Sequence, residues 1–202
     1  ATVARAPRRF DPERRDRIIS ATLDLIAEGG VAGVSHRKVA AKADVPLGSM
    51  TYHFENMGEL LRESFERFAT TVSDRFEEEL AAATSPAEAQ DAVVRLIYHG
   101  VLSESRELVL TLELYTLAAR QPVYRQINRD WMSASRRALE RHFDPDTARQ
   151  LDALIEGLSI HLALAPEPHD RALTADAVAR VCSHDVADPG KEKAPNQRGS
   201  GP

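Results

Sequence analysis

The chain has 202 residues, of which 43% are hydrophobic and 28% charged, a balance typical of a globular protein with a sizeable core. Its single cysteine, Cys182, excludes an intrachain disulfide and fits a reducing compartment. No apolar run approaches the ~18 residues that a membrane span needs, and the first residues lack the apolar core of a signal peptide. We therefore expect a cytoplasmic protein with no membrane partner.

The formal net charge is −5, and it is unevenly distributed along the chain. Residues 1–56 carry nine basic and seven acidic side chains, a net +2, so the remainder carries −7. This division is what a DNA-binding head on an acidic body would show, although +2 is far from a basic stripe.

Residues 1–10 contain three arginines and Pro7, which predict a flexible basic arm without fixed structure. Two interpretations remain open for it: an arm that orders on DNA, and a solvated tail. A helix is predicted over residues 12–28, with Asp11 as its N-cap and with Gly29 and Gly30 ending it.

Residues 34–60 predict two short helices joined by a tight turn. Ser35 is a good N-cap, and apolar residues follow it at helical spacing. The turn is Asp44-Val45-Pro46, because Asp tolerates the left-handed conformation and Pro46 biases Val45 away from the helix. A second helix over 47–54 would point Met50 and Phe54 inward and expose Leu47, Ser49, Thr51, Tyr52 and His53. Such a pair is the shape that enters a DNA major groove, although two helices around a turn also occur in helical proteins that bind no DNA.

The order of residue types in this segment is informative. It resembles the DNA-binding domain of the TetR family of bacterial transcription regulators in the segments 35–40 (SHRKVA), 44–48 (DVPLG), 50–54 (MTYHF) and 54–60 (FENMGEL). These motifs occur in order and without gaps over about residues 12–62. The chain departs from the family pattern at Asp44, where a turn glycine is usual, at Thr51, and at Met57, which replaces a phosphate-contacting lysine.

The resemblance implies an all-α fold of about nine helices, with a helix-turn-helix domain over 11–56, a helical effector-binding and dimerisation domain over 57–185 and a disordered tail over 186–202. It implies a homodimer that binds a pseudo-palindromic double-stranded DNA operator, as a repressor released by a small organic effector. The DNA-binding residues would be His36, Arg37, Lys38, Leu47, Gly48, Ser49, Thr51, Tyr52 and His53.

The rest of the chain reads as helices. The first, over 57–82, has its buried face at Leu60, Leu61, Phe65, Phe68, Ala69, Val72 and Phe76. Ser85 and Glu88 predict a capping box that opens a helix to about residue 102. In the next helix, 106–119, we expect Leu108, Leu112, Tyr115 and either Leu110 or Leu114 to point inward. Further helices are expected over 123–143, 145–164 and 174–183.

By the same resemblance, apolar and aromatic residues of the body would line an effector pocket, and these are Phe68, Val72, Phe76, Tyr98, Leu102, Leu114, Tyr115 and Trp131. An uncharged or weakly polar ligand would suit such a lining. The alternative is that these residues form plain core. A four-helix dimer interface would use Leu151, Leu154, Ile155, Leu158, Leu162 and Val178, and the alternative is packing within one chain.

Two other function classes are compatible with a helical chain: a helical interaction protein that binds no DNA, and a small helical enzyme. The histidines of the body, His99, His142 and His161, lack the spacing of a metal site. The segment 157–161 resembles a nucleophile motif only faintly, since the second glycine and the preceding strand are missing. We therefore expect no catalytic residue, no metal and no cofactor.

Overall fold

The structure is a computed structural model, and it describes residues 12–100, 102, 104–165 and 170–183. The expected arm and tail lie outside these residues. The described part is helical, as expected, and its elements are α1 (Arg14–Gly29), a 3-10 turn η1 (Val31–Gly33), α2 (His36–Lys42), α3 (Gly48–His53), α4 (Met57–Ala81), α5 (Pro86–His99), α6 (Ser105–Arg120), α7 (Pro122–Leu139), α8 (Pro145–Leu164) and α9 (Arg171–Ser183).

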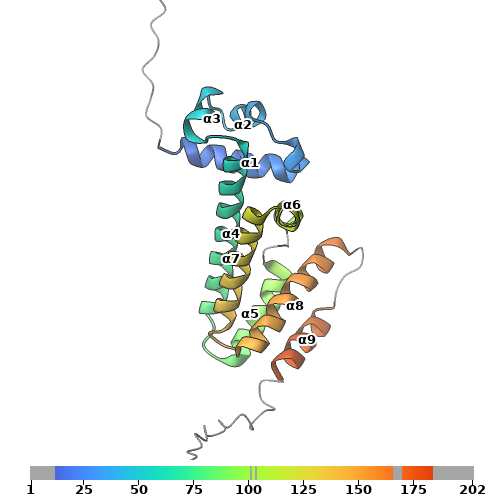
Figure 1. Cartoon of the computed structure of the whole chain (residues 1–202). Coiled ribbons are helices and arrows are strands. Elements are labelled where there is room, and N and C mark those ends of the chain that lie inside the picture. The colour runs from blue at the N-terminus through green and yellow to red at the C-terminus, as the bar shows by residue number, and fades with distance from the viewer. Residues whose placement is uncertain (1–11, 101, 103, 166–169, 184–202) are drawn as a thin grey trace, which may run out of the picture.

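Helices α1 to α3 form a head at one end of the molecule, and α4 runs from this head through the length of the body (Figure 1). Helix α7 packs along α4, and α6 lies beneath the head, where it contacts α1. Helices α5, α8 and α9 pack together in the other half of the body. None of the described helices is long and apolar enough to cross a membrane.

Local side-chain caps fix the starts of the helices. The Ser35 hydroxyl accepts a hydrogen bond from the Lys38 amide at 3.4 Å, as the sequence predicts. At the start of α4, the Asn56 side chain accepts from the Glu59 amide at 3.0 Å. The Ser85 hydroxyl accepts from the Glu88 amide at 3.2 Å, but the Glu88 carboxylate returns to Thr84 rather than to Ser85.

Two apolar clusters make up the core. The first joins the head to the upper half of α4 and to α6 and α7, so the packing continues across position 57. The second joins the lower half of α4 to α5, α7, α8 and α9. The head is therefore packed on the body through shared apolar contacts. A movement of α4 or α6 must consequently be transmitted to the head.

Three expectations about the helices are corrected. In α6, Leu110 and Leu114 are both fully buried and Leu112 is 38% exposed, because α6 is covered from the α1 side and from the α7 side at once. Helix α5 ends at His99, before the extended Gly100. Helix α7 ends at Leu139, where the chain continues in shorter turns.

Candidate nucleic-acid interface and effector cavity

The helix-turn-helix is held by backbone geometry that the sequence anticipates. Asp44 adopts a positive φ of 51°, which places it in the left-handed region that Asp tolerates. The Val45 amide then returns to the carbonyl of Ala40 at 3.0 Å. Met50 and Phe54 are buried beneath α3, so α3 presents its opposite face outward.

The structure places most of the predicted DNA-binding residues on this outer face. Leu47 is 55% exposed and Tyr52 is 83% exposed, an unusual position for large apolar surface unless a partner covers it. The other predicted residues on the exposed surface are Arg37, Lys38, Gly48 and Thr51, while His36 and His53 are half-buried. The prediction that Ser49 is exposed is wrong. Its side chain is 7% exposed, because Ser49 and its neighbour Met50 both turn toward the interior of the head.

The basic side chains of α2 differ in whether other groups of the chain bind them. The ammonium group of Lys38 donates to the Gly33 carbonyl at 2.8 Å, and Lys42 pairs with Glu28 at 2.7 Å. Arg37 is exposed, and among the described residues no carboxylate is paired with it. Arg37 is therefore the cation of α2 that is available to a phosphate or a base edge.

Two arginines of α1 belong to the same surface and were missed from the sequence. Burial and the charges of Arg14 and Arg15 lower the pKa of His53. Arg15 stacks over the Phe54 ring, 4.9 Å from its centroid, and pairs with Glu63. The run of arginines at the start of α1 was the available signal, but only the fold shows that it lies beside the end of α3.

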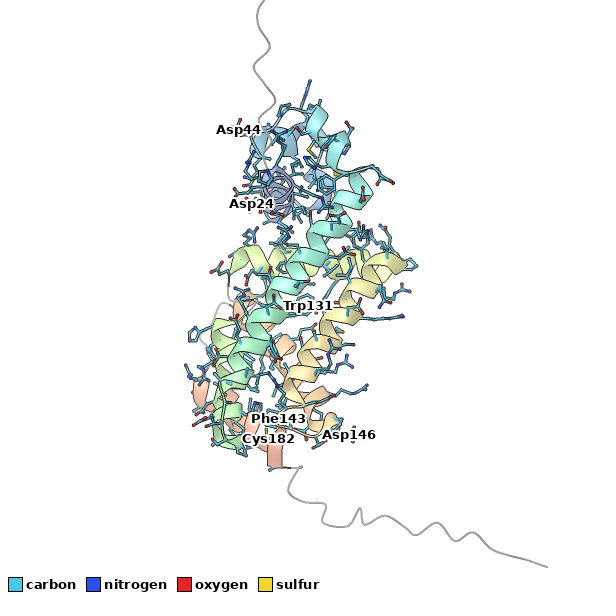
Figure 2. All side chains as sticks on the ribbon, turned by 90° about the vertical axis from the view of Figure 1, so that its left-hand side faces the viewer. Asp24, Asp44, Trp131, Phe143, Asp146 and Cys182 are labelled. Carbon is cyan, nitrogen blue, oxygen red and sulfur yellow. The ribbon has the colours of Figure 1, made fainter. Side chains whose placement is uncertain are left out.

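An internal cavity lies in the body where the two apolar clusters meet. The open space at its centre is about 50 Å³. Helices α4, α5, α6, α7 and α8 surround it, together with Leu102 from the segment between α5 and α6. Its lining consists of Phe76, Leu96, Leu102, Thr111, Tyr115, Trp131, Met132, Ser135, Asp152, Ile155, Glu156 and Ser159. Figure 2 shows Trp131 midway along the body, between α4 and α7.

Half of the predicted pocket residues line this cavity: Phe76, Leu102, Tyr115 and Trp131. The other four lie elsewhere. Phe68, Val72 and Leu114 belong to the apolar cluster beneath the head, and the Tyr98 hydroxyl lies 3.1 Å from that of Thr174 on α9. Phe68, Val72 and Leu114 were misplaced because a helix that is buried on several sides shows no single inward face.

The cavity wall is more polar than the apolar lining expected from the sequence. Asp152 and Glu156 of α8 both reach it. Asp152 pairs with Arg136 at 3.2 Å, yet burial raises the pKa of its carboxyl. Burial, together with the nearby Glu156 carboxylate, raises the pKa of the Tyr115 hydroxyl far above its usual value.

Two family models match successive parts of the chain. Residues 18–64 match the bacterial regulatory proteins of the tetR family, and residues 84–184 match the tetracyclin repressor-like C-terminal domain. A solved structure from Streptomyces coelicolor A3(2), described as a candidate transcriptional regulator, is 59% identical in sequence and superimposes with a TM-score of 0.80. The alignment covers 85% of this chain and 99% of that one.

The chain belongs to the TetR family. It is a DNA-binding transcriptional regulator with a ligand-binding C-terminal domain, and the family is not one of enzymes. The multidrug binding protein EbrR, complexed with imidazole, is 34% identical with a TM-score of 0.72 and covers 85% of this chain and 96% of its own. The regulator BetI 1 of Chromohalobacter salexigens is 27% identical over 89% of this chain and 97% of its own length.

In this TetR-family chain the predicted dimer residues fall into two groups. Leu151 and Val178 are fully buried inside the single chain and Ile155 is 8% exposed, so these three have little surface left for a partner. Leu154, Leu158 and Leu162 are partly buried and keep part of their surface outside.

The head of the TetR fold also contacts α6 through polar groups. Arg106 donates two hydrogen bonds to Asp24, at 2.8 and 3.1 Å. Glu113 accepts from the amide of Val31 at 3.3 Å. Helix α6 therefore touches the cavity on one side and the head on the other.

Proposed function

We propose that the protein is a homodimeric repressor in the cytoplasm that binds a pseudo-palindromic operator and is released when a small organic molecule occupies the cavity. The observation that carries this proposal is the pair of helices α4 and α6, each of which reaches from the cavity wall to the head. DNA binding and effector binding are thereby placed on the same two rigid elements.

On the DNA, α3 would enter the major groove with Tyr52, Thr51 and Leu47 facing the duplex. Gly48 supports this docking, because the space around its Cα is open and no side chain holds the backbone away from DNA. Arg37 from α2, with Arg14 at the start of α1, would contact phosphates or a guanine edge.

The dimer would form through the outer surface of α8 and α9. Leu154, Leu158 and Leu162 recur at steps of four along α8 and remain partly exposed, which suits a helix–helix seam between two copies. A two-fold axis there would set the separation of the two α3 helices, and operator half-sites must match one helical turn, roughly 34–36 Å.

Effector binding would act through α4 and α6. Phe76 on α4 and Tyr115 on α6 line the cavity, while the other end of α4 and the Glu113 side chain hold the head. A ligand that displaces either helix changes the spacing of the heads, and about 1–3 kcal/mol of coupling weakens DNA binding roughly 5- to 150-fold. EbrR supports an aromatic effector, since its solved complexes contain ethidium, proflavin and malachite green.

Selection of genomic DNA fragments by the purified protein tests the proposal. The expected product is an inverted repeat bound by a dimer, with affinity that falls steeply as salt rises. Arg37→Ala should cost about 1–3 kcal/mol of specific binding. Arg137→Ala, which removes the same charge at the far end of α7, is the matched control, and equal binding by both variants would remove Arg37 from the DNA surface.

A further inference from the structure

The cavity contains one carboxylate that is paired with no basic side chain of the residues that the structure describes. Asp152 is paired with Arg136 at 3.2 Å. Glu156, one helical turn further along α8, lies close to the Tyr115 hydroxyl, and the described residues that line the cavity include no lysine, arginine or histidine. The charges therefore leave the cavity with one uncompensated negative group.

A hydroxyl on the opposite wall lacks a partner as well. Thr111 is 1% exposed and lines the cavity, and its Oγ1 is buried without a hydrogen bond. Four other helical threonines bond to the carbonyl four residues earlier, as Thr22 does to Ile18 at 2.8 Å and Thr116 to Leu112 at 2.9 Å. An unsatisfied buried hydroxyl is costly, so Thr111 Oγ1 is a group that a ligand would satisfy.

Aromatic rings flank these two polar groups. The Tyr115 and Trp131 rings lie 6.3 Å apart at 44°, and Phe76 lines the same space from α4. Ring faces attract cations, most strongly where water is excluded. A flat ligand between these rings would place its edge within reach of both helices α6 and α8.

We propose that the cavity selects an aromatic organic cation with a single positive charge and an N–H donor, the charge directed at Glu156 and the donor at Thr111 Oγ1. This inference rests on the proposed function, because it names the class of effector for the same cavity. A neutral aromatic molecule would cover the half-buried Glu156 carboxylate without neutralising it, and a dication would carry one charge without a partner.

The volume of the cavity indicates which wall must move. A central space of about 50 Å³ holds a water molecule or two but not a fused aromatic ring system. Trp131 borders both this cavity and the outer groove between α4 and α7, which Ala69, Ile127 and Asp130 also line. Rotation of the indole into that groove would enlarge the cavity, and the ligand would then press on α4 and α6, which border the same space.

The test uses 9-aminoacridine, which is cationic and carries an N–H donor, and acridine, a neutral molecule of nearly the same shape at pH 8. Binding is measured by equilibrium dialysis on the full chain without DNA, because acridines bind DNA directly. The expected result is that 9-aminoacridine binds about tenfold or more tightly than acridine. Lowering the pH until acridine is protonated should raise acridine affinity toward that of the amine.

Glu156→Gln keeps the shape of the side chain and removes its charge, so it should weaken 9-aminoacridine binding about tenfold and leave acridine unchanged. Glu140→Gln removes an exposed carboxylate at the end of α7, away from the cavity lining, and should change neither affinity. Circular dichroism of both variants establishes that they are folded.

Equal affinity for the two dyes, or an unaltered affinity of Glu156→Gln for the amine, would overturn the proposal. Failure of both dyes to bind the wild-type chain would overturn it as well. Operator binding by the same preparations separates these outcomes from failure of the proposed function, because it requires no ligand.

Discussion

Gly30, at the junction of α1 and η1, is the backbone position at which a single methyl group should weaken the contact between the head and α6. Its φ is 69° and its ψ is 172°, a conformation that is essentially restricted to glycine. A Cβ built there would lie 2.7 Å from the Glu113 Oε1 atom. That carboxylate also accepts the hydrogen bond from the Val31 amide.

The cost of Gly30→Ala has two parts. The strained backbone contributes about 1–3 kcal/mol. The clash itself is relieved by rotation of the flexible Glu113 side chain, which costs the bond to Val31, about 0.5–1.5 kcal/mol. The free energy of unfolding should therefore fall by about 1.5–4.5 kcal/mol, which for a chain of this size lowers Tm by about 3–18 °C.

Thermal and urea denaturation followed by circular dichroism measures this change, and Gly29→Ala is the matched control. Gly29 is the last residue of α1, with no atom within 4 Å of an added Cβ, so alanine there should be neutral or slightly stabilising. Gly30→Ala and Glu113→Ala each lose the Val31–Glu113 hydrogen bond. The double variant loses it only once, so its fall in unfolding free energy should be smaller than the sum of the two single falls. Similar stabilities for the Gly29 and Gly30 variants would refute the reasoning.

Three further changes test the other surfaces. Leu158→Glu places a charge in the proposed α8 seam and should give a monomer that no longer binds operator; light scattering that finds a stable dimer would place the seam elsewhere. DNA phosphate beside His53 should raise its pKa, which is lowered in the free protein, so operator affinity should increase as pH falls from about 7.5 toward 5.5, and His53→Gln should flatten that dependence. Thr111→Val removes a buried, unsatisfied hydroxyl and should raise the unfolding free energy of the ligand-free protein by about 1 kcal/mol; a destabilised variant would show that the hydroxyl has a partner.

The head could be predicted closely because its determinants are local. The Ser35 cap, the left-handed Asp44 and the buried Met50 and Phe54 each follow from a residue and its near neighbours along the chain. Ser49 could not be placed in this way, since a helix of one and a half turns has no clear periodicity. Its burial depends on how α3 docks against α1 and α2.

The cavity was only half predictable, for a different reason. Helices α4 and α6 are apolar on more than one side, and the sequence does not say which apolar side meets another helix and which meets empty space. Leu114 is thus core, while Thr111 and Tyr115 face the cavity. The polar residues Asp152, Glu156 and Ser159 of α8 line the cavity as well, which an expected apolar lining does not predict.

Trp131 is the single tryptophan of the 202 residues, and it lies in the wall between the cavity and the outer groove. The protein therefore contains its own optical reporter. Indole emission depends on the polarity around the ring, and here the Phe68 and Tyr115 rings lie 5.8 and 6.3 Å from it. Occupation of the cavity should shift or quench that emission in the unmodified chain, with no second indole to dilute the signal, so ligands of unknown identity can be screened without a label.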